Sequence, residues 1–256
     1  MLDFNCYVGA WPFHPLAVET FGQLQQLHKE NGIEGGFVSS IKSIFYRDYF
    51  YSEEELHEQL KGSAYRHVLT VNPQLPACMD IVNYALENWN IAGVRILPSY
   101  HGYNLNEPAL EPLCAALEKA GLPLFLTVNL EDVRNTYLLI PKPLPMEQIA
   151  LWLEKHHGLT VVLCGPSPYD VVQIEESILC HPAAFYDPSG MRLGSFPFDN
   201  HSDELRTRLL YGSMSGILCL KSSLLHFEKK ELTPEQTKRS LYGTDFFAKC
   251  PGLTKK

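Results

Sequence analysis

Strand-like and helix-like segments alternate along the whole chain, and this alternation limits the possible folds more than any other feature. Several strand-like segments are continuous apolar runs, such as PLFLTV and LTVVLC, which is typical of parallel strands buried on both faces. The expected strands are 2–7, 35–41, 67–71, 93–97, 124–129, 160–164, 184–186 and 209–211. Amphipathic segments lie between them, one of which places Met79, Val82 and Leu86 on a single helical face.

Eight strands alternating with helices in 256 residues predict an α/β fold, a (β/α)8 TIM barrel that forms a single domain over residues 1–256. A doubly wound open sheet is the structural alternative. Against it, no G-x-G-x-x-G sequence follows the first expected strand.

Composition excludes several classes of function. The net charge of -8 is spread along the chain, and no basic patch is present for nucleic acid or an anionic membrane. No run of about 18 apolar residues is present, so a membrane span is not expected. Seven cysteines without a C-x-x-C pair indicate free thiols in a reducing compartment, and no secretory leader is evident, so we expect a cytoplasmic protein.

The longest connections follow the expected strands at their C-terminal ends, the face on which barrel enzymes carry their sites. The connection at 131–145 contains Pro141, Pro143 and Pro145, and we expect these prolines to stiffen a lid.

The run GVRILPSYHGY at 93–103 resembles the amidohydrolase-related family of (β/α)8 metal-dependent hydrolases and decarboxylases. It is preceded by VNP at 71–73 and followed by GLPLFLT, as in that family. TPEQTKRSLYGTDF at 233–246 resembles the family's closing helix. The resemblance covers essentially the whole chain and implies small-acid or lactone substrates.

The resemblance also implies one or two divalent metals, held by His-x-His on the first strand, single histidines on strands five and six, and an aspartate after strand eight. Other residues occupy all these positions here: Asn5 and Tyr7, then Asn129 (or Thr127), Cys164 and Met214. The last assignment takes 209–215 as the eighth-strand region in preference to YGTD at 242–245, which leaves too few residues for a closing helix. Because an asparagine amide and a neutral phenol are poor zinc ligands, methionine suits only soft ions and a lone cysteine cannot hold zinc, we predict no metal and no other cofactor.

Several charged groups near the expected mouth remain candidates for chemistry. Arg95, inside the fourth strand, binds either a substrate carboxylate or a structural partner in the barrel. His101 is a candidate general acid or base, followed by Tyr103, although a single loop histidine is more often a hydrogen-bonded surface group. Asp132 is the second candidate for proton transfer, with Arg134 as an anion clamp, and a solvated loop ion pair is the alternative.

Other residues are expected to line the pocket. Asp187 ends the seventh strand and either faces the mouth or caps a turn. Trp11 and His14, after the first strand, either line an apolar pocket or pack over the barrel end. We predict the following substrate-binding set: Asn5, Tyr7, Trp11, His14, Arg95, Tyr103, Asn129, Arg134, Cys164 and Asp187.

Two functions are consistent with these residues. One is a metal-independent hydrolase, lactonase or decarboxylase that acts on a small carboxylate or lactone. The other is a catalytically inactive relative that binds a small ligand or a partner. An aromatic cluster at 45–51 suits either a pocket wall or the interface of a homodimer.

Overall fold

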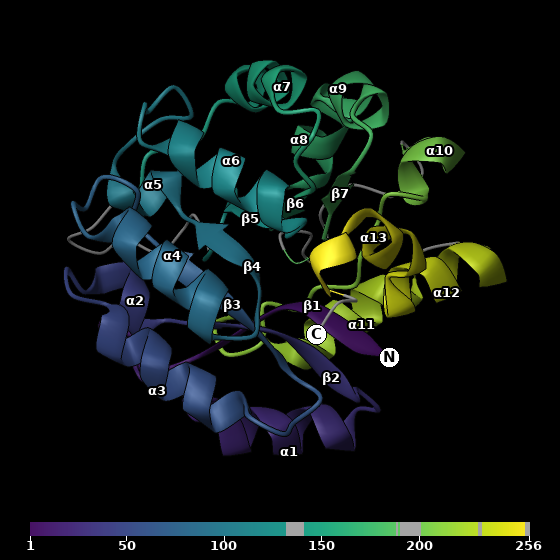
Figure 1. Ribbon diagram of the computed structural model, residues 1–256. Helices are drawn as coiled ribbons and strands as arrows, with labels where there is room; N and C mark the ends of the chain where they lie inside the picture. Colours follow the sequence, from purple (N-terminus) through teal and green to yellow (C-terminus); the bar gives the residue numbers. More distant parts are fainter. Residues whose placement is uncertain (132–140, 188, 190–200, 230–231, 254–256) are drawn as a thin grey trace.

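The computed structural model describes residues 1–131, 141–187, 189, 201–229 and 232–253 (Figure 1). Seven parallel strands form one sheet, and each strand pairs with the next along the chain. They are β1 (Leu2–Val8), β2 (Gly35–Ser40), β3 (Arg66–Val71), β4 (Ile91–Ile96), β5 (Leu124–Thr127), β6 (Val161–Cys164) and β7 (Ala184–Tyr186). The first seven expected strands are therefore confirmed, with ends that differ by at most two residues.

The helices lie around the outside of the curled sheet (Figure 1). They are α1 (Phe21–Glu30), α2 (Lys42–Phe45), α3 (Phe50–Leu60), α4 (Cys78–Asn88), α5 (Pro98–His101), α6 (Leu110–Ala120), α7 (Met146–Lys155), α8 (Pro168–Gln173), α9 (Glu175–Cys180), α10 (Asp203–Arg206), α11 (Leu220–Glu228), α12 (Pro234–Tyr242) and α13 (Thr244–Lys249). A short 3-10 helix, Pro251–Leu253, follows. Among the described residues, no helix is long and apolar enough to cross a membrane.

The expected eighth strand at 209–211 is not a regular strand. The amide of Leu210 donates to the Tyr186 carbonyl at 2.8 Å, and the amide of Phe4 donates to the Tyr211 carbonyl at 2.8 Å. This segment therefore lies between β7 and β1 and bonds to both. Residues 209–215 pair with β7 and β1 only through isolated β-bridges, Leu209 with Tyr186 and Ser215 with Cys6. The chain turns between these two bridges, at Met214, where φ is +55°.

The alternative eighth-strand position, YGTD at 242–245, lies instead at the junction of α12 and α13. Gly243 has a φ of +61° there and ends α12 in the left-handed conformation. The preference for 209–215 thus agrees with the structure.

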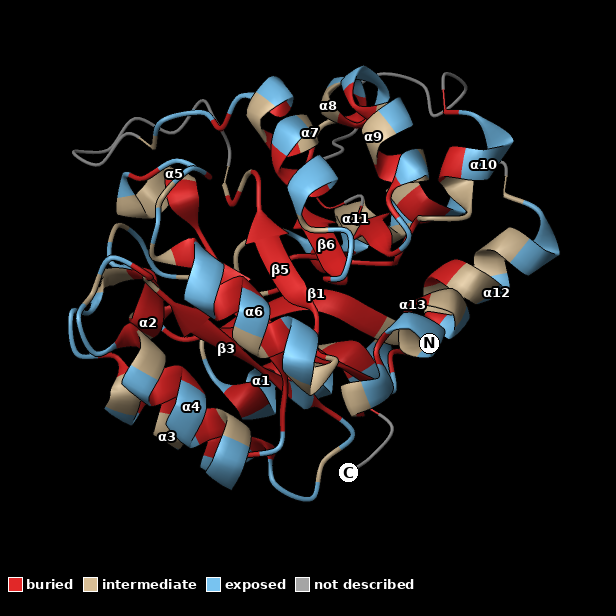
Figure 2. Cartoon of the chain, turned by 45° about the horizontal axis from the view of Figure 1, so that its top comes forward, coloured by how far each residue is buried: buried red, intermediate tan, exposed pale blue. Residues whose placement is uncertain are grey.

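Burial follows the expected pattern, with buried strands and helices that turn one face inward and the other to solvent (Figure 2). Aromatic rings fill one level of the core, where Phe37 stacks on Phe4 at 5.0 Å and contacts Phe125 at 5.8 Å between ring centroids. Phe246 of α13 packs edge-on against Phe37 at 5.7 Å. This aromatic layer underlies the polar groups described next.

Candidate functional site

Arg95 on β4 is the centre of a fully buried polar cluster. Its Nε donates to the Ser39 hydroxyl at 2.8 Å, and its Nη1 donates to the Thr127 hydroxyl at 3.1 Å. The guanidinium carbon lies 4.7 Å from the centroid of the Tyr7 ring and 5.4 Å from that of Phe125, and both rings favour a cation. The alternative to a bound substrate was a structural ion pair of Arg95 in the barrel. The hydrogen bonds of Arg95 instead go to two hydroxyl groups, and its guanidinium lies against two aromatic rings.

Asp187, directly after β7, forms the acidic side of the cluster. Its Oδ2 accepts from the Asn5 amide nitrogen at 3.0 Å, and its Oδ1 accepts from the backbone amide of Ser189 at 2.8 Å and from the Ser189 hydroxyl. Burial raises the pKa of Asp187, although the Ser189 hydrogen bonds and the charge of Arg95 oppose the rise. Asp187 therefore holds the turn at Ser189, which is one of the two roles that the sequence left open, and its Oδ2 bonds to Asn5 in the interior.

Tyr7 and Cys164 complete the cluster as neutral groups. Burial raises the pKa of the Tyr7 phenol, and it likewise raises the pKa of the Cys164 thiol. For Arg95, burial lowers the pKa, but the neighbouring Tyr7, Cys164 and Asp187 together raise it above its ordinary value. The guanidinium is thus the permanent charge of the cluster, while Cys164 is not a thiolate nucleophile.

Four buried polar atoms in this region have no hydrogen-bond partner among the described residues: Arg95 Nη2, Asn5 Oδ1, the Tyr7 hydroxyl and the Thr70 hydroxyl. Thr70 and Arg95 are register partners on β3 and β4, so they point to the same side of the sheet. Buried polar atoms are nearly always paired, and four unpaired ones in one region need an explanation.

An apolar layer covers the cluster on the side of the strands' C-terminal ends. We call it the cap; its members are Tyr7, Trp11, Ile41, Ile44, Leu97, Leu130 and Met214. Trp11 packs edge-on against Phe45 and Tyr100, with centroid distances of 5.2 and 6.1 Å. Met214, at the position of the family's aspartate, contributes a buried thioether to the cap.

His101 and Tyr103 lie outside the Arg95 cluster. The Nε2 of His101, at the end of α5, donates to the Ile44 carbonyl at 3.0 Å, and the ring stacks on Tyr103 at 6.2 Å. Burial lowers the pKa of His101. Its role as a proton carrier stays a prediction.

The remaining candidates are dispersed. Asn129 donates to the Gly165 carbonyl at 3.1 Å, near the end of β6. His14 is exposed and lines a separate groove of about 720 Å³ between α1 and residues 216–221. Asp132 and Arg134, with most of the predicted lid, lie outside the described residues.

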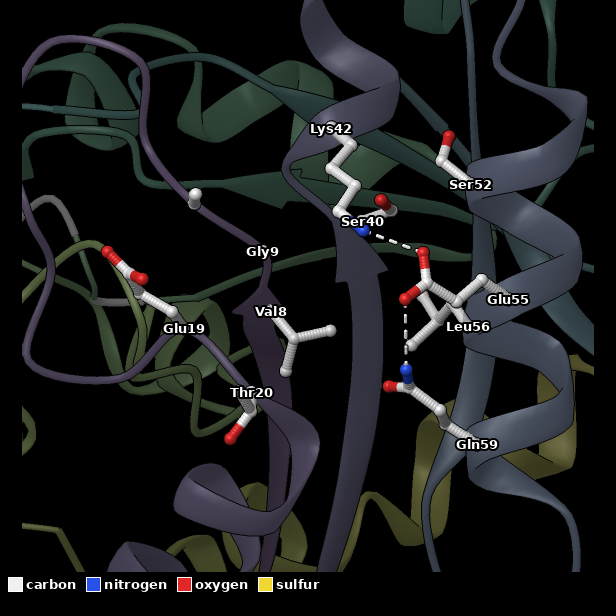
Figure 3. A pocket seen from close by; sticks show the side chains of 11 residues that line it. Val8, Gly9, Glu19, Thr20, Ser40, Lys42, Ser52, Glu55, Leu56 and Gln59 are labelled. Atoms are coloured by element: carbon white, nitrogen blue, oxygen red, sulfur yellow. Dashed lines mark hydrogen bonds and ion pairs between the residues drawn. The ribbon is translucent and has the colours of Figure 1, made fainter.

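A cavity of about 240 Å³ lies outside the sheet, at the C-terminal ends of β1 and β2 (Figure 3). Lys42 forms an ion pair of 2.6 Å with Glu55, which also accepts from Gln59 at 3.4 Å. These groups satisfy one another along one wall, and none of the predicted site residues lines the cavity.

The aromatic residues expected as one cluster after β2 are divided between two places. Phe45 joins the rings against the cap, and Tyr49 is buried. Tyr46 and Tyr51 are exposed, at 55% and 72%, on the outside of the molecule. A homodimer through this surface stays a prediction.

The sequence did not show that the hydroxyl groups of Ser39, Thr70 and Thr127 lie together around Arg95. The only signal was a polar residue within an otherwise apolar strand. A second buried cluster, Asp3, Cys6 and His28, was also missed.

No protein-family model and no curated protein matches the chain. Solved structures do. One is 5-carboxyvanillate decarboxylase from Sphingomonas paucimobilis, with a TM-score of 0.74, 10% identity, and coverage of 97% of this chain and 98% of that one. Another is a TIM-barrel protein from Bordetella bronchiseptica, with a TM-score of 0.69, 16% identity, and coverage of 98% and 99%.

An amidohydrolase II structure is also similar, with a TM-score of 0.66, 16% identity and coverage of 99% of both chains. Identities this low show the fold alone. The neighbours nonetheless agree with the resemblance of the GVRILPSYHGY region. The chain therefore has the fold of TIM-barrel proteins that include an amidohydrolase and a decarboxylase.

Proposed function

We propose that this protein binds a small carboxylate between its cap and its aromatic layer, with Arg95 as the anion anchor. One observation carries the proposal: Arg95 Nη2 is a fully buried guanidinium nitrogen with no hydrogen-bond partner among the described residues. A guanidinium pairs well with a carboxylate, and the unpaired Tyr7 and Thr70 hydroxyls can donate to the same ligand. Asn5 Oδ1 supplies an acceptor, which suits a hydroxyl on the ligand.

The donors at this site do not fit a divalent metal of the kind that the fold family implies. At the ligand positions that the resemblance implies, they are a carboxamide, a phenol, a single thiol and a thioether, from Asn5, Tyr7, Cys164 and Met214, with no imidazole among them. The nearby Asp187 carboxyl is already hydrogen-bonded to Asn5 and Ser189. An ion there would also face the permanent charge of Arg95. We therefore propose a site that works without a metal and uses the guanidinium as its positive charge.

The substrate class is supported by one structural neighbour, whose name, 5-carboxyvanillate decarboxylase, specifies a carboxylate substrate. The cap adds a geometric limit. Because the cap residues Trp11 and Met214 are almost fully buried, a ligand that reaches Arg95 through the cap needs cap side chains to move. A small ligand with an apolar body is the class that such a site accommodates.

A metal-independent hydrolase, lactonase or decarboxylase is the second candidate function. Asp187 favours it, because it is a fully buried carboxyl group whose pKa is raised by burial, which is a feature of carboxyl groups that transfer protons in active sites. His101 and Asp132 remain proposed proton carriers in this scheme.

Thermal denaturation with a panel of small carboxylates and lactones tests the proposal. We expect at least one carboxylate to raise the melting temperature of the wild type and to have little effect on Arg95→Lys, which keeps the charge but lacks the forked donors. Arg66→Lys is the matched control, since Arg66 is exposed and lies over the ring of Phe247. Chromatography of the mixture after incubation then separates an enzyme from a binder.

The proposal fails if no carboxylate stabilises the wild type, or if the stabilisation survives unchanged in Arg95→Lys. Product formation from a stabilising ligand selects the enzymatic candidate, and full recovery of the ligand selects the binding protein.

A further inference from the structure

Asp3, Cys6 and His28 form a buried group of three different donors away from the Arg95 cluster. Asp3 and Cys6 come from β1, and His28 comes from α1. One donor atom from each, namely a carboxylate oxygen, the thiol sulfur and an imidazole nitrogen, lies within 4.8 Å of the other two. All three side chains are fully buried.

An irregularity in β1 brings the two strand residues to the same side. The register of β1 against β2 shifts between Asp3 and Cys6, so these residues both face α1 although they are three positions apart. Cys6 packs in the cluster that includes Phe21 and Leu24 of α1. A regular strand would turn residues three apart to opposite faces.

The imidazole of His28 is oriented toward this group. Its Nδ1 is hydrogen-bonded to the Tyr65 hydroxyl at 3.1 Å. Its Nε2 lies 3.3 Å from Asp3 Oδ2, but it is a buried atom with no partner that meets hydrogen-bond geometry. An imidazole with one nitrogen held by a hydrogen bond and the other directed at a carboxylate and a sulfur is typical of a metal ligand.

The Asp3 carboxylate is also fixed from outside the group. Its Oδ1 accepts from the backbone amides of Asn5 and Ser213, both at 3.0 Å. Such supporting hydrogen bonds orient carboxylate ligands in metal sites and leave Oδ2 directed at the other donors. The Ser213 hydroxyl also bonds to Oδ2, so an ion must share this oxygen.

We propose that Asp3, Cys6 and His28 bind one divalent transition-metal ion, of which Zn²⁺ is the best match. A set of one oxygen, one nitrogen and one sulfur suits zinc, and donors on one zinc ion lie about 3.5 Å apart, so the observed spacing needs only a small contraction. Three protein donors leave the fourth position of a tetrahedral ion for a water molecule. Because the three side chains are buried and belong to β1 and α1, the ion would tie this strand to this helix.

Charge balance supports this assignment. The ion displaces the proton of the Cys6 thiol, and this proton is released to solvent. The resulting thiolate and the Asp3 carboxylate carry two negative charges, which balance the two positive charges of the ion. No side chain of the Arg95 cluster supplies a donor to this group, so this proposal does not depend on carboxylate binding.

Elemental analysis and cobalt spectroscopy test the site on the full chain. We expect purified protein to retain about one equivalent of zinc through dialysis, and chelator-treated protein to take up Co²⁺ with a near-ultraviolet absorption band from a thiolate ligand. Cys6→Ser and His28→Gln should lose the band. Cys114→Ser, another buried cysteine on α6, should keep it.

The proposal is overturned if wild-type protein binds neither ion, in which case the group is a buried Asp–His pair. It is also overturned if Cys6→Ser retains the metal and the thiolate band. If Cys6→Ser does not fold, alkylation of wild-type Cys6 in mild urea decides the matter. Zinc should slow the labelling of Cys6 at least tenfold, and an unchanged rate contradicts the site.

Discussion

At the scale of single residues, the polar cluster beneath the cap is organised around the charge of Arg95. Arg95 lies between an aromatic layer and an apolar cap, and hydroxyl groups, not a carboxylate, accept the hydrogen bonds that its Nε and Nη1 donate. Hydroxyl groups carry no charge, and burial raises the pKa of the nearby Asp187 carboxyl, so the guanidinium can still attract an anionic ligand.

Replacing Arg95 should therefore affect stability as well as binding. In Arg95→Met, Ser39 and Thr127 lose their donor and the Asp187 carboxyl loses its nearby cation, so we expect the free energy of unfolding to fall by about 3 kcal/mol. Urea denaturation measures this loss. Arg66→Met, which removes an exposed arginine, should cost less than about 1 kcal/mol, and equal losses in the two variants would contradict the structural role of Arg95.

Asp187 leads to a prediction about pH. Its pKa is raised in the folded protein, so the folded state binds its proton more tightly than the unfolded state does. This residue's contribution to stability should be fully present below its ordinary pKa near 3.8 and should fall as the pH rises through the raised value.

The comparison of wild type with Asp187→Asn isolates that contribution. Urea denaturation from pH 4 upward should show the wild type losing stability relative to the variant as the pH increases, until the carboxyl group is ionised in both states. A difference that grows in favour of the wild type would show instead that Arg95 lowers the pKa of Asp187.

Met214 allows a test of backbone conformation. Among the described residues, Met214 is the one residue other than glycine that has a positive φ, at +55°. Only glycine adopts this conformation without cost, so Met214→Gly should be more stable than Met214→Ala by about 1 kcal/mol, although both lose the same cap contacts. Thermal or urea denaturation compares them, and a more stable alanine variant would refute the left-handed turn.

At the scale of elements, the connection from β7 back to β1 determines whether the sheet has free edges. Four backbone hydrogen bonds join residues 210–215 to the two strands: those donated by Phe4, Tyr7, Leu210 and Met214. Their N–O distances are 2.6 to 2.8 Å. The segment thus joins both edges without forming a regular strand.

Hydrogen exchange tests this arrangement. We expect the amides of Phe4, Tyr7, Leu210 and Met214 to exchange about as slowly as those in the middle of β4, because all are buried and hydrogen-bonded. Exchange measured by NMR would contradict the arrangement if these four amides exchanged as fast as exposed loop amides.

Local patterns predicted most of these elements. A capping box begins α12 at Thr233, and Gly121 ends α6. Both can be read from the sequence, because each depends only on neighbouring residues. Residues 209–211 were predicted as a strand because their apolar run is strand-like, but they form no regular strand. The turn at Met214 has no local signal in the sequence.

At the scale of the whole molecule, the sequence predicted part of the site. Asn5, Tyr7, Arg95, Cys164 and Asp187 lie together because the ends of neighbouring parallel strands meet at one face of the sheet. His14 and His101 lie elsewhere, because a loop residue's position depends on packing that no spacing rule gives. The Asp3–Cys6–His28 group depends on an irregularity in β1 and on how α1 packs, neither of which the sequence reveals.

Anchoring of a carboxylate by the Arg95 guanidinium can be tested without altering the protein, by NMR of ¹⁵N-labelled arginine side chains. The Arg95 signals, assigned by their absence from Arg95→Lys, should shift in a saturable way with a carboxylate that stabilises the protein. They should not shift with the corresponding methyl ester. Unchanged Arg95 signals at saturating carboxylate would contradict the role of Arg95 as the anion anchor.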